Sequence, residues 1–132
     1  GDGRYYLSGV ALSAVLGAMC SLGYAEYTGS GFSCKDGSPG DSVSHLNGEN
    51  GDCRYIAIKN RHMNELTYTS HKHFDWDKNV GFLNALYKFG YKLFGSNPVK
   101  IKENKLLPHS KSWSGHNNHV HLHNFNPNLE DI

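Results

Sequence analysis

The sequence predicts a single domain of the α+β class, and three observations lead to that prediction. The chain has 132 residues, which is enough for one hydrophobic core and too few for two domains. Hydrophobic residues make up 38% of it and charged residues 19%, which excludes a disordered chain. Segments with helical and strand-like patterns follow one another without a repeat or an evident linker. We therefore expect one domain over residues 1–132, with a small antiparallel sheet flanked by helices.

The first predicted helix covers residues 7–22, a mostly apolar run that ends before Gly23. One face of it carries four apolar side chains: Leu12, Val15, Leu16 and Met19. The core of a signal peptide is the competing interpretation, although only Arg4 precedes the run. The run lacks the roughly 18 uninterrupted apolar residues of a membrane span, so we expect no such span.

The middle of the chain combines strand-like segments with a long loop. Residues 24–33 carry the spaced aromatic side chains of a short strand, and residues 35–51 are rich in glycine and serine. Long loops in small domains are often functional. Residues 55–58, shortly after Asp52, are apolar and predict a strand that is buried on both faces.

The strongest helical pattern covers residues 77–94, with Asp75 or Asp77 as its N-cap. The lysine-rich residues 99–107 predict an extended, exposed segment. Residues 119–125 alternate between polar and apolar side chains and therefore predict a strand.

Charge and histidine content point in different directions. The 13 basic and 12 acidic residues nearly cancel, which gives no argument for nucleic acid or an anionic membrane as a partner. In contrast, the chain has nine histidines, and five of them fall within residues 109–123. Imidazole is the commonest metal ligand in proteins, so this cluster predicts a functional site.

The cysteines Cys20, Cys34 and Cys53 form no C-x-x-C pair, which excludes a zinc ribbon. A disulfide between Cys34 and Cys53 would add about 3 kcal/mol in the entropic account and would imply a location outside the cytosol. Three unpaired thiols are the alternative. Because the chain begins Gly-Asp-Gly without an initiator methionine, we expect a piece processed or excised from a longer protein.

Two segments carry residues suited to metal chemistry. In residues 44–52, His45 and Asp52 bracket a glycine-containing turn that can fold both side chains onto one ion. In residues 115–123, three histidines alternate along the predicted strand: His119, His121 and His123. They would share one face at intervals of about 6.5 Å, so that one can bind an ion while another reaches its bound water. Two histidines and an aspartate with an open position suit a catalytic zinc site and hydrolysis.

Together, the two segments resemble the D-alanyl-D-alanine zinc metallopeptidase family, whose relatives include the Hedgehog signalling domain. The family pattern is Ser-(x)-His-x-x-Gly-x-x-x-Asp, followed far downstream by His-x-His. The matching residues are Ser44, His45, Gly48, Asp52, His119 and His121. His116 precedes the final pair as in the penicillin-insensitive murein endopeptidase branch, and residues 30–33 are similar to the segment that usually leads into the first motif. The resemblance spans about residues 30–123 and implies a Hedgehog/DD-peptidase-like fold.

The resemblance implies a role for each matching residue. His45, Asp52 and His121 would hold Zn²⁺, and His119 would stand beside the metal-bound water as a base. His116 would assist from the same site, and Trp113, which precedes it closely, is expected in the site wall. Many relatives carry an arginine where this chain has Ser33, and Lys35 is the candidate substitute for contact with the substrate.

The implied substrate is a peptide stem or cross-link of bacterial peptidoglycan, with endopeptidase activity favoured over carboxypeptidase activity. Such a substrate implies a periplasmic or secreted, monomeric hydrolase. If the chain is the catalytic part of an antibacterial toxin or a lysin, an inhibitor or immunity protein is a further expected partner.

Other classes fit the residues less well. A cupin site needs a glutamate soon after its H-x-H, whereas the next glutamate after His121 is Glu130. A toxin-type histidine–asparagine nuclease would need a basic cleft, which the composition near the C-terminus does not supply. The strongest alternative is a non-catalytic, zinc-stabilised binding module of the same fold, which the absence of the arginine favours. His71 and His73 are interpreted either as a rim for substrate or, more simply, as local packing.

Overall fold

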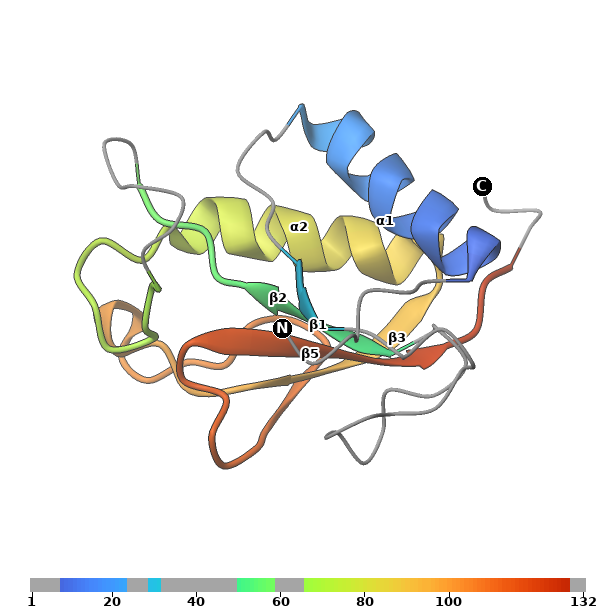
Figure 1. Ribbon diagram of the computed structural model, residues 1–132. Helices are drawn as coiled ribbons and strands as arrows, with labels where there is room; N and C mark the ends of the chain where they lie inside the picture. Colours follow the sequence, from blue (N-terminus) through green and yellow to red (C-terminus); the bar gives the residue numbers. More distant parts are fainter. Residues whose placement is uncertain (1–7, 24–28, 32–49, 59–65, 129–132) are drawn as a thin grey trace.

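The computed structural model describes residues 8–23, 29–31, 50–58 and 66–128 of the chain. Within these residues the elements follow in this order (Figure 1): α1 (Gly9–Leu22), β1 (Gly29–Gly31), β2 (Gly51–Arg54), α2 (Trp76–Phe89), β3 (Tyr91–Ser96), the 3₁₀ helix η1 (Lys100–Lys102), β4 (Ser110–Ser112) and β5 (His119–Phe125). The predicted α+β class is confirmed. No helix in this described part is long and apolar enough to cross a membrane.

The five described strands form one sheet in the order β1-β2-β5-β3-β4. The prediction of an antiparallel sheet was wrong for its last pair, because β4 runs parallel to β3, with Phe94 opposite Ser110. The other neighbouring pairs are antiparallel. Parallel neighbours need a crossover of about a dozen residues or more, and residues 97–109 supply it. The sheet is therefore mixed.

Both helices lie on the same side of this sheet (Figure 1). The N-terminal helix was predicted correctly, and its C-terminal stop is Gly23 in the left-handed conformation, with φ of 67°. The predicted buried face was wrong in part, because Leu12 and Leu16 are 44% and 48% exposed. The residues of α1 that are buried are mostly small: Ala11, Ala14, Val15 and Ala18.

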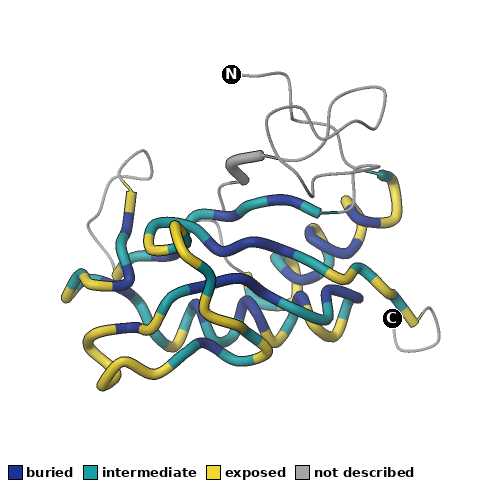
Figure 2. Tube along the Cα trace, turned by 90° about the horizontal axis from the view of Figure 1, so that it is seen from below, coloured by how far each residue is buried: buried dark blue, intermediate teal, exposed yellow. Residues whose placement is uncertain are grey.

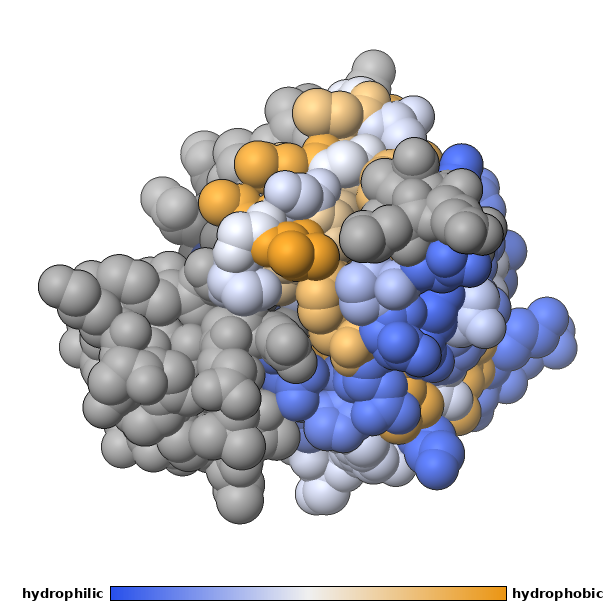
Figure 3. Space-filling view, turned by 90° about the vertical axis from the view of Figure 1, so that its right-hand side faces the viewer, coloured by the Kyte–Doolittle hydropathy of each residue, from blue (hydrophilic) through white to orange (hydrophobic). Residues whose placement is uncertain are grey.

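Close packing between the helices explains why small residues form the buried face of α1. A Cβ atom at Gly17 would lie 2.7 Å from the ring of Phe89 at the end of α2, which is closer than side chains approach. The larger apolar side chains of α1 are instead left at the surface, and Figure 3 shows apolar residues gathered where α1 lies.

The second helix is shorter than the predicted 77–94. Its N-cap is Asp75, one of the two residues predicted for that position. The Asp75 carboxylate accepts a hydrogen bond from the backbone N–H of Lys78 at 3.0 Å. It ends at Phe89 because Gly90 adopts φ of 130°, a conformation that a side chain disfavours. The chain then continues as β3, in which Tyr91 and Phe94 are buried rather than lined up on a helix.

Three other predicted segments differ from the structure in detail. The strand expected at residues 55–58 lies earlier, as β2, and is followed by an isolated bridge between Ala57 and Phe74. The lysine-rich segment is largely exposed as predicted, but it contains η1 instead of being extended throughout. The predicted strand at 119–125 coincides with β5. Of residues 24–33, the structure describes only 29–31, and the long loop lies almost wholly outside the described residues.

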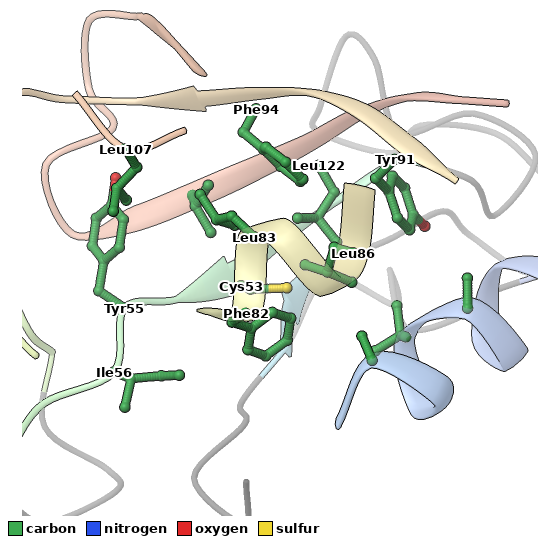
Figure 4. Close-up of a cluster of buried hydrophobic side chains, with 14 of the residues drawn as sticks. Cys53, Tyr55, Ile56, Phe82, Leu83, Leu86, Tyr91, Phe94, Leu107 and Leu122 are labelled. Atoms are coloured by element: carbon green, nitrogen blue, oxygen red, sulfur yellow. The ribbon is translucent and has the colours of Figure 1, made fainter. Parts of the chain in front are cut away.

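The hydrophobic core lies between the sheet and α2. Figure 4 shows Phe94 of β3 and Leu122 of β5 facing Leu83 and Leu86 of α2, and all four are at most 2% exposed. Because successive side chains of a strand point to opposite faces, the neighbours of Leu122 face away from the helices. The histidines of β5 therefore lie on the face of the sheet opposite α1 and α2. We call it the helix-free face, because neither helix of the described residues lies there, and Figure 2 shows the sheet from that side.

Candidate functional site

Asp52 of β2 and His121 of β5 form the centre of the candidate site. They are direct cross-strand partners in the antiparallel register, so their side chains emerge side by side on the helix-free face. The ring N–H at Nδ1 of His121 donates to Oδ1 of Asp52 at 2.9 Å. The imidazole is 6% exposed and the carboxylate 19% exposed, so the pair is sheltered but accessible. The structure thus brings together two of the three predicted metal ligands.

His119 joins this pair from the same face of β5. Its Nε2 lies 3.9 Å from Oδ1 of Asp52. Its Nδ1 donates to the side-chain oxygen of Asn118 at 2.7 Å, and this bond fixes the ring hydrogen on Nδ1. The lone pair of the neutral ring is therefore on Nε2, the nitrogen nearer to the carboxylate.

His116 reaches the cluster from the segment between β4 and β5, which descends below the sheet (Figure 1). The centre of its ring lies 4.7 Å from that of His119 and 6.0 Å from that of His121. Its Nδ1 donates to the backbone oxygen of Ser114 at 2.9 Å, so its lone pair is also on Nε2. The predicted grouping of these histidines is present in the structure.

Trp113 lies over Gly95 in the middle of this face. The centre of its ring system is 5.6 Å from the rings of both His116 and His121 and 5.8 Å from that of His123. A Cβ atom at Gly95 would lie 2.1 Å from the Trp113 ring, so only glycine permits this contact. The prediction that Trp113 belongs to the site wall agrees with this position.

Residues that the sequence did not single out hold the 113–118 segment in place. The Tyr55 hydroxyl donates to the His116 backbone oxygen at 2.8 Å, and burial raises the pKa of Tyr55, which keeps this donor protonated. The side-chain amide of Asn97 donates a hydrogen bond to the backbone oxygen of Trp113 at 2.9 Å. The backbone N–H of Thr69 donates one to the backbone oxygen of Asn117 at 2.8 Å. No local pattern could reveal these long-range bonds, and Gly95, which directly follows the helix predicted over 77–94, gave no sign of its place inside β3.

His123 lies at the other end of the histidine row and has a different environment. Its Nδ1 accepts a hydrogen bond from the Asn50 side-chain amide at 3.1 Å. Burial, and secondarily the nearby His121, lower the pKa of His123, which favours its neutral form. Its position agrees with the expectation that it neighbours the site rather than forming its centre.

Several predicted residues lie outside the described part of the chain: Ser33, Cys34, Lys35, Ser44, His45 and Gly48. The third metal ligand, the candidate substrate contact and the Cys34–Cys53 bridge thus stay predictions. Cys53 is buried in the core. Within the described residues, no three histidine, cysteine, aspartate or glutamate side chains are grouped so that they could hold a metal ion by themselves.

The donor set that is described fits a zinc ion. Zinc accepts imidazole nitrogen and carboxylate oxygen at about 2.0–2.2 Å, and in a tetrahedral site two such donors lie about 3.3–3.6 Å apart. The facing nitrogen and oxygen of His121 and Asp52 are 2.9 Å apart in their hydrogen bond, on two strands that fix their backbones, so an ion held by both would replace the hydrogen between them and part them by a few tenths of an ångström. One further ligand, as predicted for His45, would complete three protein ligands with one position open.

No model of a known protein family, no curated protein and no solved structure matches this chain.

Proposed function

We propose that this chain is a zinc peptidase of the D-alanyl-D-alanine metallopeptidase type that hydrolyses the peptide stems or cross-links of bacterial peptidoglycan. The observation that supports it most is the meeting of Asp52, His121 and His119 on one sheet face. These three residues come from two motifs that are far apart in the sequence, the same two motifs that carry the resemblance to the family. Endopeptidase action on cross-links is favoured over removal of a terminal D-alanine because His116 precedes His119 and His121 as in the murein endopeptidase branch that the sequence resembles.

In this proposal His45, Asp52 and His121 hold the zinc ion. When bound, zinc supplies Lewis acidity toward the scissile carbonyl and lowers the pKa of its water. The strand register keeps Asp52 and His121 in place for this role, because shifting either strand by one residue would turn its side chain to the core face.

His119 is the proposed base. Its Nε2 takes a proton from the attacking water and gives it to the leaving amine nitrogen, which is required for the peptide bond to break. The hydrogen bond from its Nδ1 to Asn118 supports this role, because it fixes the tautomer and the orientation of the ring.

His116, Trp113 and Lys35 are assigned to the substrate. Lys35, and His116 when its Nε2 also carries a proton, would stabilise the negative oxygen of the tetrahedral intermediate, a contribution that preorganised charges and dipoles usually make. Trp113 offers an apolar surface beside the histidines, which would exclude water from one side of the bound peptide.

The proposed substrate implies the cellular location of the protein and its partners. Peptidoglycan lies outside the cytoplasm, so the protein would act in the periplasm or after secretion, as a monomer. A role as a cell-wall-degrading toxin or lysin would bring an inhibitor or immunity protein as a partner.

The second candidate is a zinc-stabilised binding module without catalysis. The observation that favours it is Ser33, which stands where many family members carry an oxyanion-binding arginine.

Mass spectrometry of digested peptidoglycan separates the two candidates. The wild type should convert cross-linked muropeptides to monomers, and a chelator should abolish this reaction. His119→Ala should lower the rate about 10²- to 10⁴-fold, the usual contribution of a general base, while His109→Ala, a histidine outside the site, should keep the wild-type rate. Loss of a terminal alanine alone would indicate a carboxypeptidase. Unchanged muropeptides from a protein that still holds zinc would contradict the hydrolase and favour the binding module.

A further inference from the structure

One row of residues crosses the sheet from the candidate site to the outer strand β4. Asp52 of β2 lies opposite His121 of β5. His121 lies opposite Gly95 of β3, which in turn lies opposite Lys111 of β4. Because directly opposed residues of neighbouring strands carry their side chains on the same face, Lys111 emerges on the helix-free face. It therefore stands in line with the two proposed zinc ligands.

Two strand spacings separate His121 from Lys111, because β3 alone lies between β5 and β4. Neighbouring strands are about 4.8 Å apart, which places the two backbones about 10 Å from each other. An extended peptide advances about 3.3 Å per residue, so about three residues cover this distance. One short peptide can thus reach the proposed zinc ion and Lys111 at the same time.

The surface between these two positions is formed by Trp113. Gly95 has no side chain, and the Trp113 ring takes the space, since a Cβ atom at Gly95 would lie 2.1 Å from that ring. The centre of the same ring system is 5.6 Å from the centre of the His121 ring. Trp113 is half-buried, so part of it is open to a ligand. A peptide that follows the row would pack on an aromatic surface before it reaches Lys111.

Lys111 brings an exposed positive charge to this face. In the described part of the chain no carboxylate forms an ion pair with it, and Asp52 is engaged by the histidines. The other described acidic residues lie at the start of α2 or directly after η1: Asp75, Asp77 and Glu103. The ammonium group is therefore available to a carboxylate that a ligand supplies.

We propose that Lys111 binds a carboxylate of the substrate about three residues from the scissile bond, so that the protein prefers acidic peptides. The inference rests on the proposed function, which places the scissile bond at the zinc ion. The recognised group is thus distinct from a terminal carboxylate next to that bond. Lysine suits this contact because its compact charge sits on a flexible chain and can follow carboxylates in somewhat different positions.

An exposed lysine on an outer strand also has a simpler use. Such lysines prevent the open edge of a sheet from pairing with another chain, and β4 is the last strand of this sheet. The two uses predict different consequences of removing the charge. Loss of a substrate contact weakens the binding of acidic peptides, whereas loss of edge protection promotes self-association.

Binding of cross-linked muropeptides from purified peptidoglycan tests the proposal. One set keeps the free carboxylates of its peptide stems, and in the other set they are converted to amides. Lys111→Ala should weaken binding of the first set about two- to fivefold, the range of exposed ion pairs, and should not change binding of the second. Salt of about 1 M should reduce the difference. Lys88→Ala, which removes an exposed lysine from α2, is the matched control and should bind both sets like the wild type.

Calorimetry in a zinc-loaded His119→Ala background measures binding without cleavage, and the KM of the active protein should rise by the same factor at constant kcat. Equal weakening for both sets, or no binding of either, would overturn the proposal. Unchanged affinity together with self-association in sedimentation would overturn it in favour of edge protection. If cleavage occurs but does not depend on residue 111, the proposed hydrolysis stands and this inference fails. Binding that depends on Lys111 without cleavage would support the contact and contradict the hydrolysis.

Discussion

The two faces of the sheet use the same strand in opposite ways. On the side of the helices, Leu122 is completely buried among apolar side chains of α2 and β3. On the other side, its neighbour His121 is hydrogen-bonded to Asp52 and surrounded by aromatic rings. The helix-facing residues hold the strand in place, and the histidines on the opposite face depend on that position for their mutual geometry. Burial of one face of a strand therefore fixes its register, and the fixed register sets the positions of the side chains on the other face.

The largest effect on stability is expected on the helix-facing side. Leu122→Ala should lower the free energy of unfolding by about 2–5 kcal/mol, because it leaves a cavity in a packed core. Chemical denaturation measures this change. The matched control is Lys111→Ala, an exposed residue of β4 that pairs with Gly95 on the opposite face, which should change stability by less than about 0.5 kcal/mol. Equal effects of the two substitutions would contradict the contrast between the two faces.

A smaller loss of stability is expected at Gly95, on the opposite face. Gly95→Ala places a methyl group against the Trp113 ring and should cost about 1–3 kcal/mol, as overpacking usually does. Tryptophan fluorescence should shift at the same time, because Trp113 must move. Gly115→Ala is the comparison, since its left-handed φ of 80° strains a side chain although nothing crowds it. A Gly95→Ala variant with unchanged fluorescence would show that the ring is not held there.

Removal of the Tyr55 hydroxyl should have a still smaller effect on stability. Tyr55→Phe leaves the ring and removes the donor to His116, which should cost about 1 kcal/mol. The His116 ring signals should broaden in NMR spectra as the 113–118 segment loosens. Peptidase activity should fall in Tyr55→Phe but not further in a His116→Ala background, because Tyr55 acts through His116. Additive losses of activity in the double variant would mean that Tyr55 has no positioning role for His116.

The smallest effect concerns pH and lies far from the site. Burial, and then the nearby Lys92, lower the pKa of His109 from the ordinary value of 6.5. The folded state therefore binds this proton less readily than the unfolded state, and stability declines as the pH falls through 6.5 towards the lowered pKa. Urea denaturation at pH 7.5 and 5.5 should show a smaller decline for His109→Gln than for the wild type. An identical decline in both proteins would refute this contribution.

The predictable parts of the fold are those whose pattern is local. The alternation of residues 119–125 predicted β5, and the start of α2 was predicted at Asp75 or Asp77, of which Asp75 is the N-cap. The end of α2 was predicted too late because Tyr91 and Phe94 continue the apolar spacing of the helix. The chain leaves the helix at Gly90, and pairing with β5 makes the following residues the strand β3. The parallel pairing of β4 depends on the crossover path, which no local spacing encodes.

The same distinction applies to the candidate site. Asp52 and His121 lie opposite each other on neighbouring strands, so their side chains emerge on the same face of the sheet. This agrees with the expectation that the two motifs meet. The support of His116 by Tyr55 joins residues 61 positions apart, and the contact of Trp113 with Gly95 joins a loop to a strand. In α1, alanines rather than leucines form the buried face because Phe89 of α2 lies close to Gly17. The periodicity of the sequence does not show this close packing.

Native mass spectrometry of bound zinc tests the central claim most directly, because it asks whether the helix-free face holds the ion at Asp52. The wild type, purified with zinc and without chelator, should carry one tightly held Zn²⁺ per chain. Asp52→Ala should carry none, whereas Asp77→Ala, which removes an exposed carboxylate from α2, should retain it. A wild type without zinc, or an Asp52→Ala variant that keeps its zinc, would contradict the account.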